Sequence, residues 1–291
     1  MSEAVPSMSE KVQGLDSGTS MRRIRFVEAI SGKDVVLMSF KDPAPCYAIV
    51  VEAPSKATGS TAAELRGHEL EVALSTMPTN AQGSALAANR DMVEWMKQGG
   101  DPTLPPVFIK ARGVELMWRP GLALLQCDAE QADALHTAVV EFAHYEYELR
   151  RIEDEIANTW AELEQDKALA FDVTPTDLGR SVVVGERMNR VMQRRIRLAR
   201  IEPHLYDPVA SLPATGQKLG YELRERTRIE ARLETVDAQL EVFEGIYEMS
   251  GQRMGEYRAA RQEHVLEWII IVLLAAEMVL LLLQTVWKPG V

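Results

Sequence analysis

The chain has 291 residues and a net charge of −11 at pH 7. A surface that is acidic overall does not attract nucleic acid or anionic lipid, so either ligand would need a local basic patch. The two cysteines, Cys46 and Cys127, are too few and too far apart for a disulfide framework or a zinc knuckle, and they fit a reducing compartment.

The first 127 residues predict a tail followed by a mixed domain. Residues 1–20 contain Ser, Gly and Glu without hydrophobic periodicity, which predicts a disordered tail. Residues 21–127 contain short runs rich in β-branched and aromatic residues, and such runs predict strands. The runs are "IRFVEAI" at 24–30, "DVVLMSF" at 34–40, "CYAIVVEA" at 46–53, and up to three strands in "PPVFIKARGVELMWRPGLALLQC" at 105–127. The last stretch breaks at Gly113 and at Pro120-Gly121.

Two helices are predicted between the early and the late strands. The first, "TAAELRGHELEVAL" at 61–74, opens with Thr61 and Glu64 in the spacing of a capping box. The second, "ANRDMVEWMKQGG" at 88–100, ends on a glycine pair suited to a C-cap. We therefore predict an α+β fold for residues 21–127, followed by long antiparallel helices.

The region from 128 to 214 predicts two helices of opposite charge. The first is acidic, is expected near 128–168, and has one apolar face. Its apolar positions follow at steps of three, four or seven: Leu135, Val139, Phe142, Leu149, Ile152, Ile156 and Leu163. Its other faces carry Glu141, Glu146, Glu148, Glu153, Asp154, Glu155, Glu162, Glu164 and Asp166. The second helix, near 182–202, is rich in arginine and is expected to end near Pro203.

The arginines of the second helix define a candidate binding surface. At 100° per residue four of them fall on one side, and we call this set the arginine stripe: Arg187, Arg190, Arg194 and Arg197. Guanidinium groups suit phosphate, so ribosomal RNA and lipid headgroups are candidate ligands. In the competing interpretation, the acidic helix lies antiparallel beside the stripe and neutralises it. A ligand-binding stripe must be exposed, whereas an internal stripe must face carboxylates.

Residues 215–265 predict one long helix. Apolar residues keep a 4-3-4-3 rhythm, which is the heptad signature of a coiled coil or a long helical hairpin. They are Ile229, Leu233, Val236, Leu240, Phe243, Tyr247, Met254 and Tyr257, with Ser250 at the one polar position. No proline occurs between Pro213 and Pro289, so the helix is expected to run from about 216 to 287 without a break.

The stretch 266–287 predicts a membrane span. A helix needs about 20 apolar residues to cross about 30 Å of hydrocarbon, and Trp268 and Trp287 stand at its two ends as interfacial aromatic residues. Glu267 lies where its carboxylate can reach water. Glu277 lies near the middle, where a charged side chain costs at least about 2.5 kcal/mol, so we expect it to be protonated or paired inside a bundle.

The flanking residues predict the orientation of the span. Arg253, Arg258 and Arg261 precede it and Lys288 follows it, and this bias places the large domain on the cytoplasmic or equivalent side. The first 20 residues have no apolar region of the kind found in a signal peptide. We therefore expect a tail-anchored protein with a single C-terminal span, in the inner membrane if bacterial and facing the matrix if mitochondrial.

The span and the helix before it resemble a known family. Leu266, Glu267 and Trp268, the three isoleucines that follow, and Glu277 match the C-terminal signature of the "required for meiotic nuclear division"/YagE family. The resemblance extends more loosely back to about residue 105. The family's mitochondrial members are inner-membrane proteins that form large homo-oligomers and support translation by holding ribosomes near the membrane, whereas its bacterial members have no settled function. The resemblance therefore implies a membrane protein of this kind. It implies no catalytic residues.

A search for chemistry finds no enzyme signature. The sequence has no Walker phosphate loop, no dinucleotide fingerprint and no nucleophile elbow, and Glu141 with His144 gives only one half of a di-iron motif. We assign no catalytic, cofactor-binding or metal-binding residues. The expected function is an oligomeric, membrane-anchored scaffold or tether, with lipid, further copies of the chain and the ribosome or RNA as partners. The alternative is an enzyme or ligand-binding module in residues 21–127 that the span merely localises.

Overall fold

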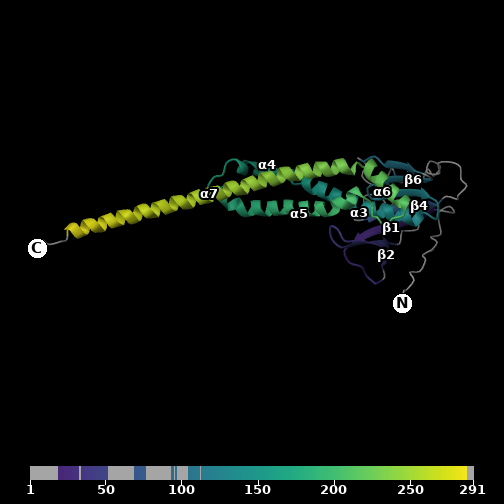
Figure 1. The fold of residues 1–291 in the computed structure, drawn as a ribbon, viewed down its shortest axis with the longest axis horizontal. Coiled ribbons are helices and arrows are strands. Elements are labelled where there is room, and N and C mark those ends of the chain that lie inside the picture. The colour runs from purple at the N-terminus through teal and green to yellow at the C-terminus, as the bar shows by residue number, and fades with distance from the viewer. Residues whose placement is uncertain are drawn as a thin grey trace. The chain divides into compact units, whose positions relative to one another are not determined.

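The computed structural model describes residues 19–32, 34–51, 69–76, 93–94, 96, 104–111 and 113–286. The elements follow one another as strands and then helices, drawn as a ribbon in Figure 1. Two compact units are present. Unit 1 contains residues 1–154 and 196–236, and unit 2 contains residues 155–195 and 237–291.

Seven strands of the described residues form one sheet in unit 1. They are β1 (Thr19–Val27), β2 (Val35–Phe40), β3 (Cys46–Val51), β4 (Glu69–Thr76), β5 (Val107–Ala111), β6 (Val114–Arg119) and β7 (Leu122–Cys127). Their order in the sheet is β2-β3-β1-β4-β7-β6-β5. All neighbours are antiparallel except β4 and β7, which are parallel. The sheet is therefore two antiparallel halves joined along β4 and β7.

The predicted α+β class is confirmed, as are most of the predicted strands. The turns between the late strands lie where glycine was expected, because Gly113 and Gly121 have φ angles of 83° and 79°. A positive φ costs glycine little, whereas it strains residues with a Cβ atom. Strands β6 and β7 thus pair directly across a two-residue loop, with Arg119 opposite Leu122.

The helix predicted at 61–74 is wrong over its second half. Residues 69–76 form strand β4, which pairs with β1 on one side and β7 on the other. The tail predicted at 1–20 is also wrong at its end, because Thr19 and Ser20 belong to β1. Residues 1–18 and 61–68 lie outside the described residues, and of the helix predicted at 88–100 only residues 93, 94 and 96 are described, all three as helical.

The acidic helix is shorter than predicted. It begins at Ala132 and ends at Ala157 (α3), and a second helix, α4 (Trp160–Asp166), follows after a two-residue break. At the break the Thr159 hydroxyl donates to the Glu155 carbonyl over 2.6 Å. Two 3-10 turns, η2 (Lys167–Ala170) and η3 (Asp177–Arg180), complete the connection to the next helix.

The remaining helices are α5 (Ser181–Tyr206), α6 (Ala214–Arg226) and α7 (Ile229–Val286). Helix α5 includes Pro203 and continues beyond it, so the predicted end near Pro203 is three residues short. The single helix predicted from 216 is wrong at its start, because Arg228 has a φ angle of 54° and separates α6 from α7. From Ile229 onward the expected continuity is present over all 58 residues of α7.

The apolar positions predicted for the helices form buried cores. In unit 1, α3 packs on the sheet, where Phe142 meets Trp118 of β6 edge to face at a ring-centroid distance of 5.3 Å. Helix α6 comes close to α3, because a Cβ atom at Gly216 would lie 3.2 Å from the Ala134 carbonyl oxygen. In unit 2, Phe243 of α7 contacts Trp160 of α4 at 4.8 Å.

Candidate functional site

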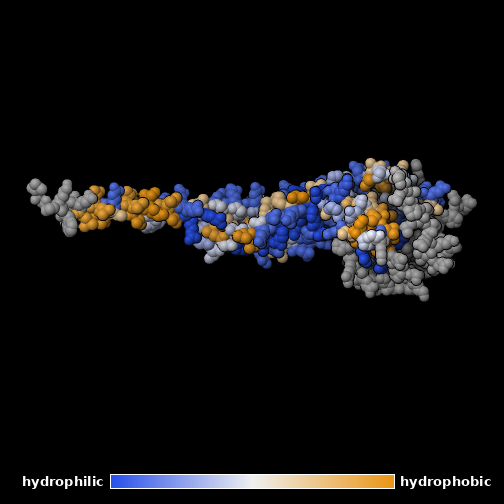
Figure 2. Space-filling view, turned by 90° about the horizontal axis from the view of Figure 1, so that it is seen from below, coloured by the Kyte–Doolittle hydropathy of each residue, from blue (hydrophilic) through white to orange (hydrophobic). Residues whose placement is uncertain are grey.

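The C-terminal part of α7 exposes apolar side chains on every face. The large apolar residues from Val265 to Leu283 are each about half exposed or more, with Trp268 at 61%. The helix is long and apolar enough to cross a membrane, and none of its most apolar 18-residue window is buried. Figure 2 shows this stretch as a hydrophobic segment at the end of α7. Trp287, the second predicted interfacial residue, lies outside the described residues.

The two acidic residues of this stretch have different surroundings. Glu267 pairs with His264 one turn earlier, at 3.2 Å between the carboxylate and Nδ1. Glu277 is exposed, follows Ala275 and Ala276, and has no ion-pair or hydrogen-bond partner among the described residues. Ten residues turn an α-helix through about 1000°, so the two carboxylates point about 80° apart. They therefore cannot share one partner easily.

The arginine stripe lies beside carboxylates in the structure. Within unit 2, Arg187 pairs with Asp166 and with Glu162, and Arg190 pairs with Glu162 at 3.0 Å. Arg194 is 8% exposed and its Nε donates to Glu155 over 3.2 Å. All three acidic partners come from the end of α3 or from α4.

The rest of the arginine-rich helix is paired as well. Within unit 1, Arg197 lies 3.5 Å from Glu148 of α3. Within unit 2, Arg195 bridges Asp237 and Glu244 of α7. These contacts favour the interpretation that the stripe is neutralised inside the fold. They count against a free phosphate-binding surface, although Arg190 keeps 49% of its side chain exposed.

Two arginines hold unit 1 together through further ion pairs with carboxylates of α3, and no local sequence pattern predicts these pairs. Arg224 of α6 bonds Glu141 of α3 at 3.0 Å and the His204 carbonyl at 2.6 Å, and Glu141 is fully buried. Burial raises the pKa of Glu141, and the Arg224 charge partly offsets that rise. Arg232 of α7 makes a bidentate ion pair with the Glu153 carboxylate and also donates to the Glu146 carboxylate.

The histidines of α3 are buried and are not arranged as metal ligands. His144 stacks on Phe40 at 3.9 Å, and its Nε2 lies 3.2 Å from the Asp42 carbonyl. His136 has no hydrogen-bond partner for either ring nitrogen among the described residues. Burial lowers the pKa of each histidine to about 4. Among the described residues, no three His, Cys, Asp or Glu side chains are placed to hold a metal ion.

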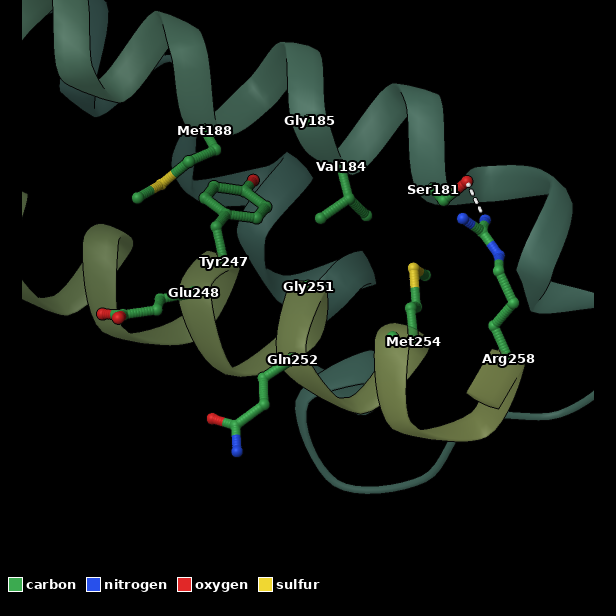
Figure 3. Close-up of a pocket in the computed structure, with 11 residues that line it drawn as sticks. Ser181, Val184, Gly185, Met188, Tyr247, Glu248, Gly251, Gln252, Met254 and Arg258 are labelled. Atoms are coloured by element: carbon green, nitrogen blue, oxygen red, sulfur yellow. Dashed lines mark hydrogen bonds between the residues drawn. The ribbon is translucent and has the colours of Figure 1, made fainter. Parts of the chain in front are cut away.

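A cavity of about 320 Å³ lies in unit 2 between the start of α5 and the middle of α7. Figure 3 shows Val184 and Met254 facing it, with the Gly251 backbone between Tyr247 and Met254. At its end nearest the apolar stretch, Arg258 donates to the Ser181 hydroxyl over 3.2 Å. Glycines of both helices line the cavity, Gly185 of α5 and Gly251 and Gly255 of α7, and no pattern in the sequence predicts it.

The chain was also compared with known proteins. No protein-family model matches it, and no curated protein matches it. The resemblance to the "required for meiotic nuclear division"/YagE family therefore remains a prediction from residues 266–277 and the preceding helices.

Proposed function

We propose that the protein is a membrane-anchored scaffold or tether. In this proposal α7 crosses a bilayer once, from about residue 266, and the preceding part presents a helical platform to a large partner. The observation that carries the proposal is the continuity of α7. One unbroken helix runs from residues buried in the protein, such as Leu240 and Phe243, into a stretch where no large side chain is buried.

The length of the exposed stretch fits a bilayer. At 1.5 Å per residue, residues 266–286 span about 30 Å, the thickness of the hydrocarbon core. In water the same residues would leave a continuous apolar surface far larger than single-chain soluble proteins expose. A lipid environment removes that cost without any further protein contact.

An oligomer gives Glu277 a partner that a single chain lacks. A protonated carboxylic acid can donate a hydrogen bond to a neighbouring helix, and such contacts in membranes contribute about 0.6–2 kcal/mol. Ala275 and Ala276 leave room for close approach of a second helix. We therefore propose that the scaffold is a homo-oligomer whose spans touch near Glu277.

The partner of the platform is proposed from the family resemblance, which points to the ribosome. The ion pairs of the arginine stripe favour a contact surface other than the stripe, because those guanidinium groups already face carboxylates. The proposed localisation is a membrane with the platform on the cytoplasmic or equivalent side.

A pair of substitutions tests the anchor. Leu274→Arg with Leu280→Arg places two charges near the middle of the span, at a cost of about 5–7 kcal/mol for insertion. We expect the variant to leave the membrane fraction on alkaline carbonate extraction. Leu274→Phe with Leu280→Phe is the matched control and should stay membrane-bound. If the arginine variant stays in the membrane fraction to the same extent as the control, the proposed membrane span is wrong.

A second experiment tests the tether. Affinity purification from native membranes, followed by mass spectrometry, should recover ribosomal proteins with the unaltered chain. The arginine variant of the span should lose them if the membrane brings the partners together. Recovery of the enzymes of one metabolic pathway would instead favour the alternative, a ligand-binding or enzymatic α+β domain.

A further inference from the structure

The connection between α4 and α5 exposes large apolar side chains. Phe171 is 75% exposed, and Val182 and Val183 in the first turn of α5 are 68% and 41% exposed. We call these three residues the apolar tip. The three residues lie within twelve positions of one another in the chain, and exposed apolar patches mark protein or membrane interaction sites.

The two valines of the apolar tip lie close to the start of the proposed span. Arg258 of α7 bonds Ser181, the residue before Val182, and Figure 3 shows this contact. Arg258 precedes Val265 by seven residues, which places the start of α5 about 10 Å along the helix from the apolar stretch. The headgroup layer is about 5–8 Å thick. Side chains that point along α7 from this position can therefore reach the headgroups.

The connection is held in one conformation by its own polar contacts. Arg180 donates to Asp166 over 2.6 Å, which ties the end of the connection to its beginning. The Thr174 amide donates to the Asp177 carboxylate over 3.0 Å. A connection that is already ordered loses little conformational entropy when it binds, and ordering entropy is a main cost of binding.

The charges of the connection favour an apolar contact over an electrostatic one. Lys167 and Arg180 are matched by Asp172 and Asp177, so the segment has no basic excess that would draw it to anionic lipid. We propose that the apolar tip inserts into the boundary between headgroups and acyl chains, beside α7, as a second membrane contact. This inference rests on the proposed membrane span. The second contact would fix how unit 2 is rotated about α7 relative to the bilayer.

Nitroxide labels on the full chain in phosphatidylcholine nanodiscs test the inference. The label is attached at Asp172→Cys, which leaves the apolar tip intact, in a Cys46→Ser background. Cys127 is buried and the pKa of its thiol is raised to about 11, mainly by burial, so it does not compete for the label. Two further labels serve as references. The label at Val279→Cys reports on lipid because it lies in the span, and the label at Val242→Cys reports on water because it lies about 35 Å along α7 before Val265.

The measurement compares collisions of each label with oxygen, which enters lipid, and with a water-soluble nickel chelate. We expect the Asp172 label to meet nickel severalfold less often than the Val242 label while staying accessible to oxygen. Adding Phe171→Ser and Val182→Ser should restore the nickel collisions at Asp172. The Val279 label should be accessible to oxygen only.

Three outcomes overturn the inference. If the Asp172 label meets nickel as often as the Val242 label while the Val279 label is in lipid, the tip is in water and the anchor stands. If the Asp172 label is shielded from both reagents, a second copy or another protein covers the tip. If the Val279 label meets nickel freely, the proposed span fails, and this inference fails with it.

Discussion

Asp166 and Glu277 are carboxylates in opposite situations within unit 2. Asp166 is 1% exposed and is held by two arginines, Arg180 and Arg187. Glu277 lies on the exposed apolar stretch and has no partner among the described residues. Both belong to helices and have apolar residues near them in the sequence. Leu163 and Leu169 stand three positions to either side of Asp166, and Met278 directly follows Glu277.

The difference between Asp166 and Glu277 shows what a buried carboxylate in this chain needs. Each acidic side chain buried in the helices of this chain has a basic partner on another helix, as Glu141 has Arg224 and Glu146 has Arg232. A carboxylate buried without such a partner shifts its pKa and takes up a proton rather than staying charged. If Glu277 is buried in a bilayer, its partner is therefore a proton, another copy of the chain or another membrane protein.

Removing a basic partner should have the largest effect. Arg224→Met leaves Glu141 fully buried without its counter-charge, and breaking such a pair costs about 3–5 kcal/mol. Burial already raises the pKa of Glu141, and loss of Arg224 raises it further, so the variant can take up a proton as the pH falls. Its loss of stability, measured by urea unfolding, should therefore be greater at pH 7 than at pH 5.

A double variant serves as the control for this loss. Glu141→Gln with Arg224→Met removes both charges, so most of the lost stability should return and the extra loss at pH 7 relative to pH 5 should disappear. If Arg224→Met alone unfolds at the same urea concentration as the unaltered chain, the buried pair contributes nothing. The comparison with Glu277 would then lose its basis.

The arginine stripe should respond as an internal network. Replacing Arg190, Arg194 and Arg197 with Gln removes three partly exposed pairs, each contributing up to about 1 kcal/mol, so unfolding should become easier by up to about 3 kcal/mol. Arg253→Gln, in the exposed pair with Glu256, is the control and should change little. Unchanged stability with weaker, less salt-dependent RNA binding would favour the exposed interpretation instead.

Local signals predicted much of the fold because the structure follows them. The Gly113 and Pro120-Gly121 turns place β5, β6 and β7 correctly. The strand β4 was missed because the capping-box spacing of Thr61 and Glu64 suggested a helix, while "ELEVALST" alternates apolar and polar residues with the period of a strand. The break at Arg228, which has a positive φ, has no glycine or proline to announce it in the sequence.

The candidate site was only partly predictable, for a different reason. The apolar stretch and its two glutamates depend on consecutive residues, so composition alone reveals them. The ion pairs join residues far apart in the chain, as in Arg190 with Glu162, 28 positions apart, and Arg224 with Glu141, 83 positions apart. Sequence supplies the charges of such pairs but not their register. The apolar tip was missed because Phe171 and the valines stand out only through their exposure in the fold.

A buried polar side chain without a hydrogen-bond partner among the described residues sharpens the comparison. His136 is 1% exposed, and its pKa is lowered from 6.5 to about 4, mainly by burial and also by the Arg22 charge. The unfolded chain therefore binds a proton between pH 6.5 and 4 that the folded chain does not bind. Stability should fall as the pH falls through this range, by about 2 kcal/mol between pH 7 and pH 5 for this histidine.

Urea unfolding of His136→Phe at both pH values measures that contribution. The variant should lose about 2 kcal/mol less than the unaltered chain on acidification. Part of the pH dependence should remain, because burial also lowers the pKa of His144 to about 4. His264→Phe, at an exposed position, is the control and should behave like the unaltered chain. An identical pH dependence in His136→Phe would show that His136 finds a partner or water in the folded protein.

The effect of Glu277 on assembly should be the smallest of these effects and the most informative. Glu277→Leu removes the only acidic side chain in the middle of the apolar stretch, so insertion becomes easier by at least about 2.5 kcal/mol if the group was charged. An oligomer whose helices bond through Glu277 should at the same time become less stable, by about 0.6–2 kcal/mol at each contact. Insertion and assembly are thus expected to change in opposite directions.

Native mass spectrometry in detergent separates these two effects. The unaltered chain should give one oligomer, and Glu277→Leu should give a dissociated or mixed population at the same protein concentration. Glu277→Gln is the matched control, because a carboxamide keeps a donor and an acceptor in the same place and should retain the oligomer. If all three forms give the same oligomer with equal stability, the carboxylic acid does not join copies of this chain. Its partner would then be a different membrane protein, and cross-linking from position 277 in native membranes would identify it.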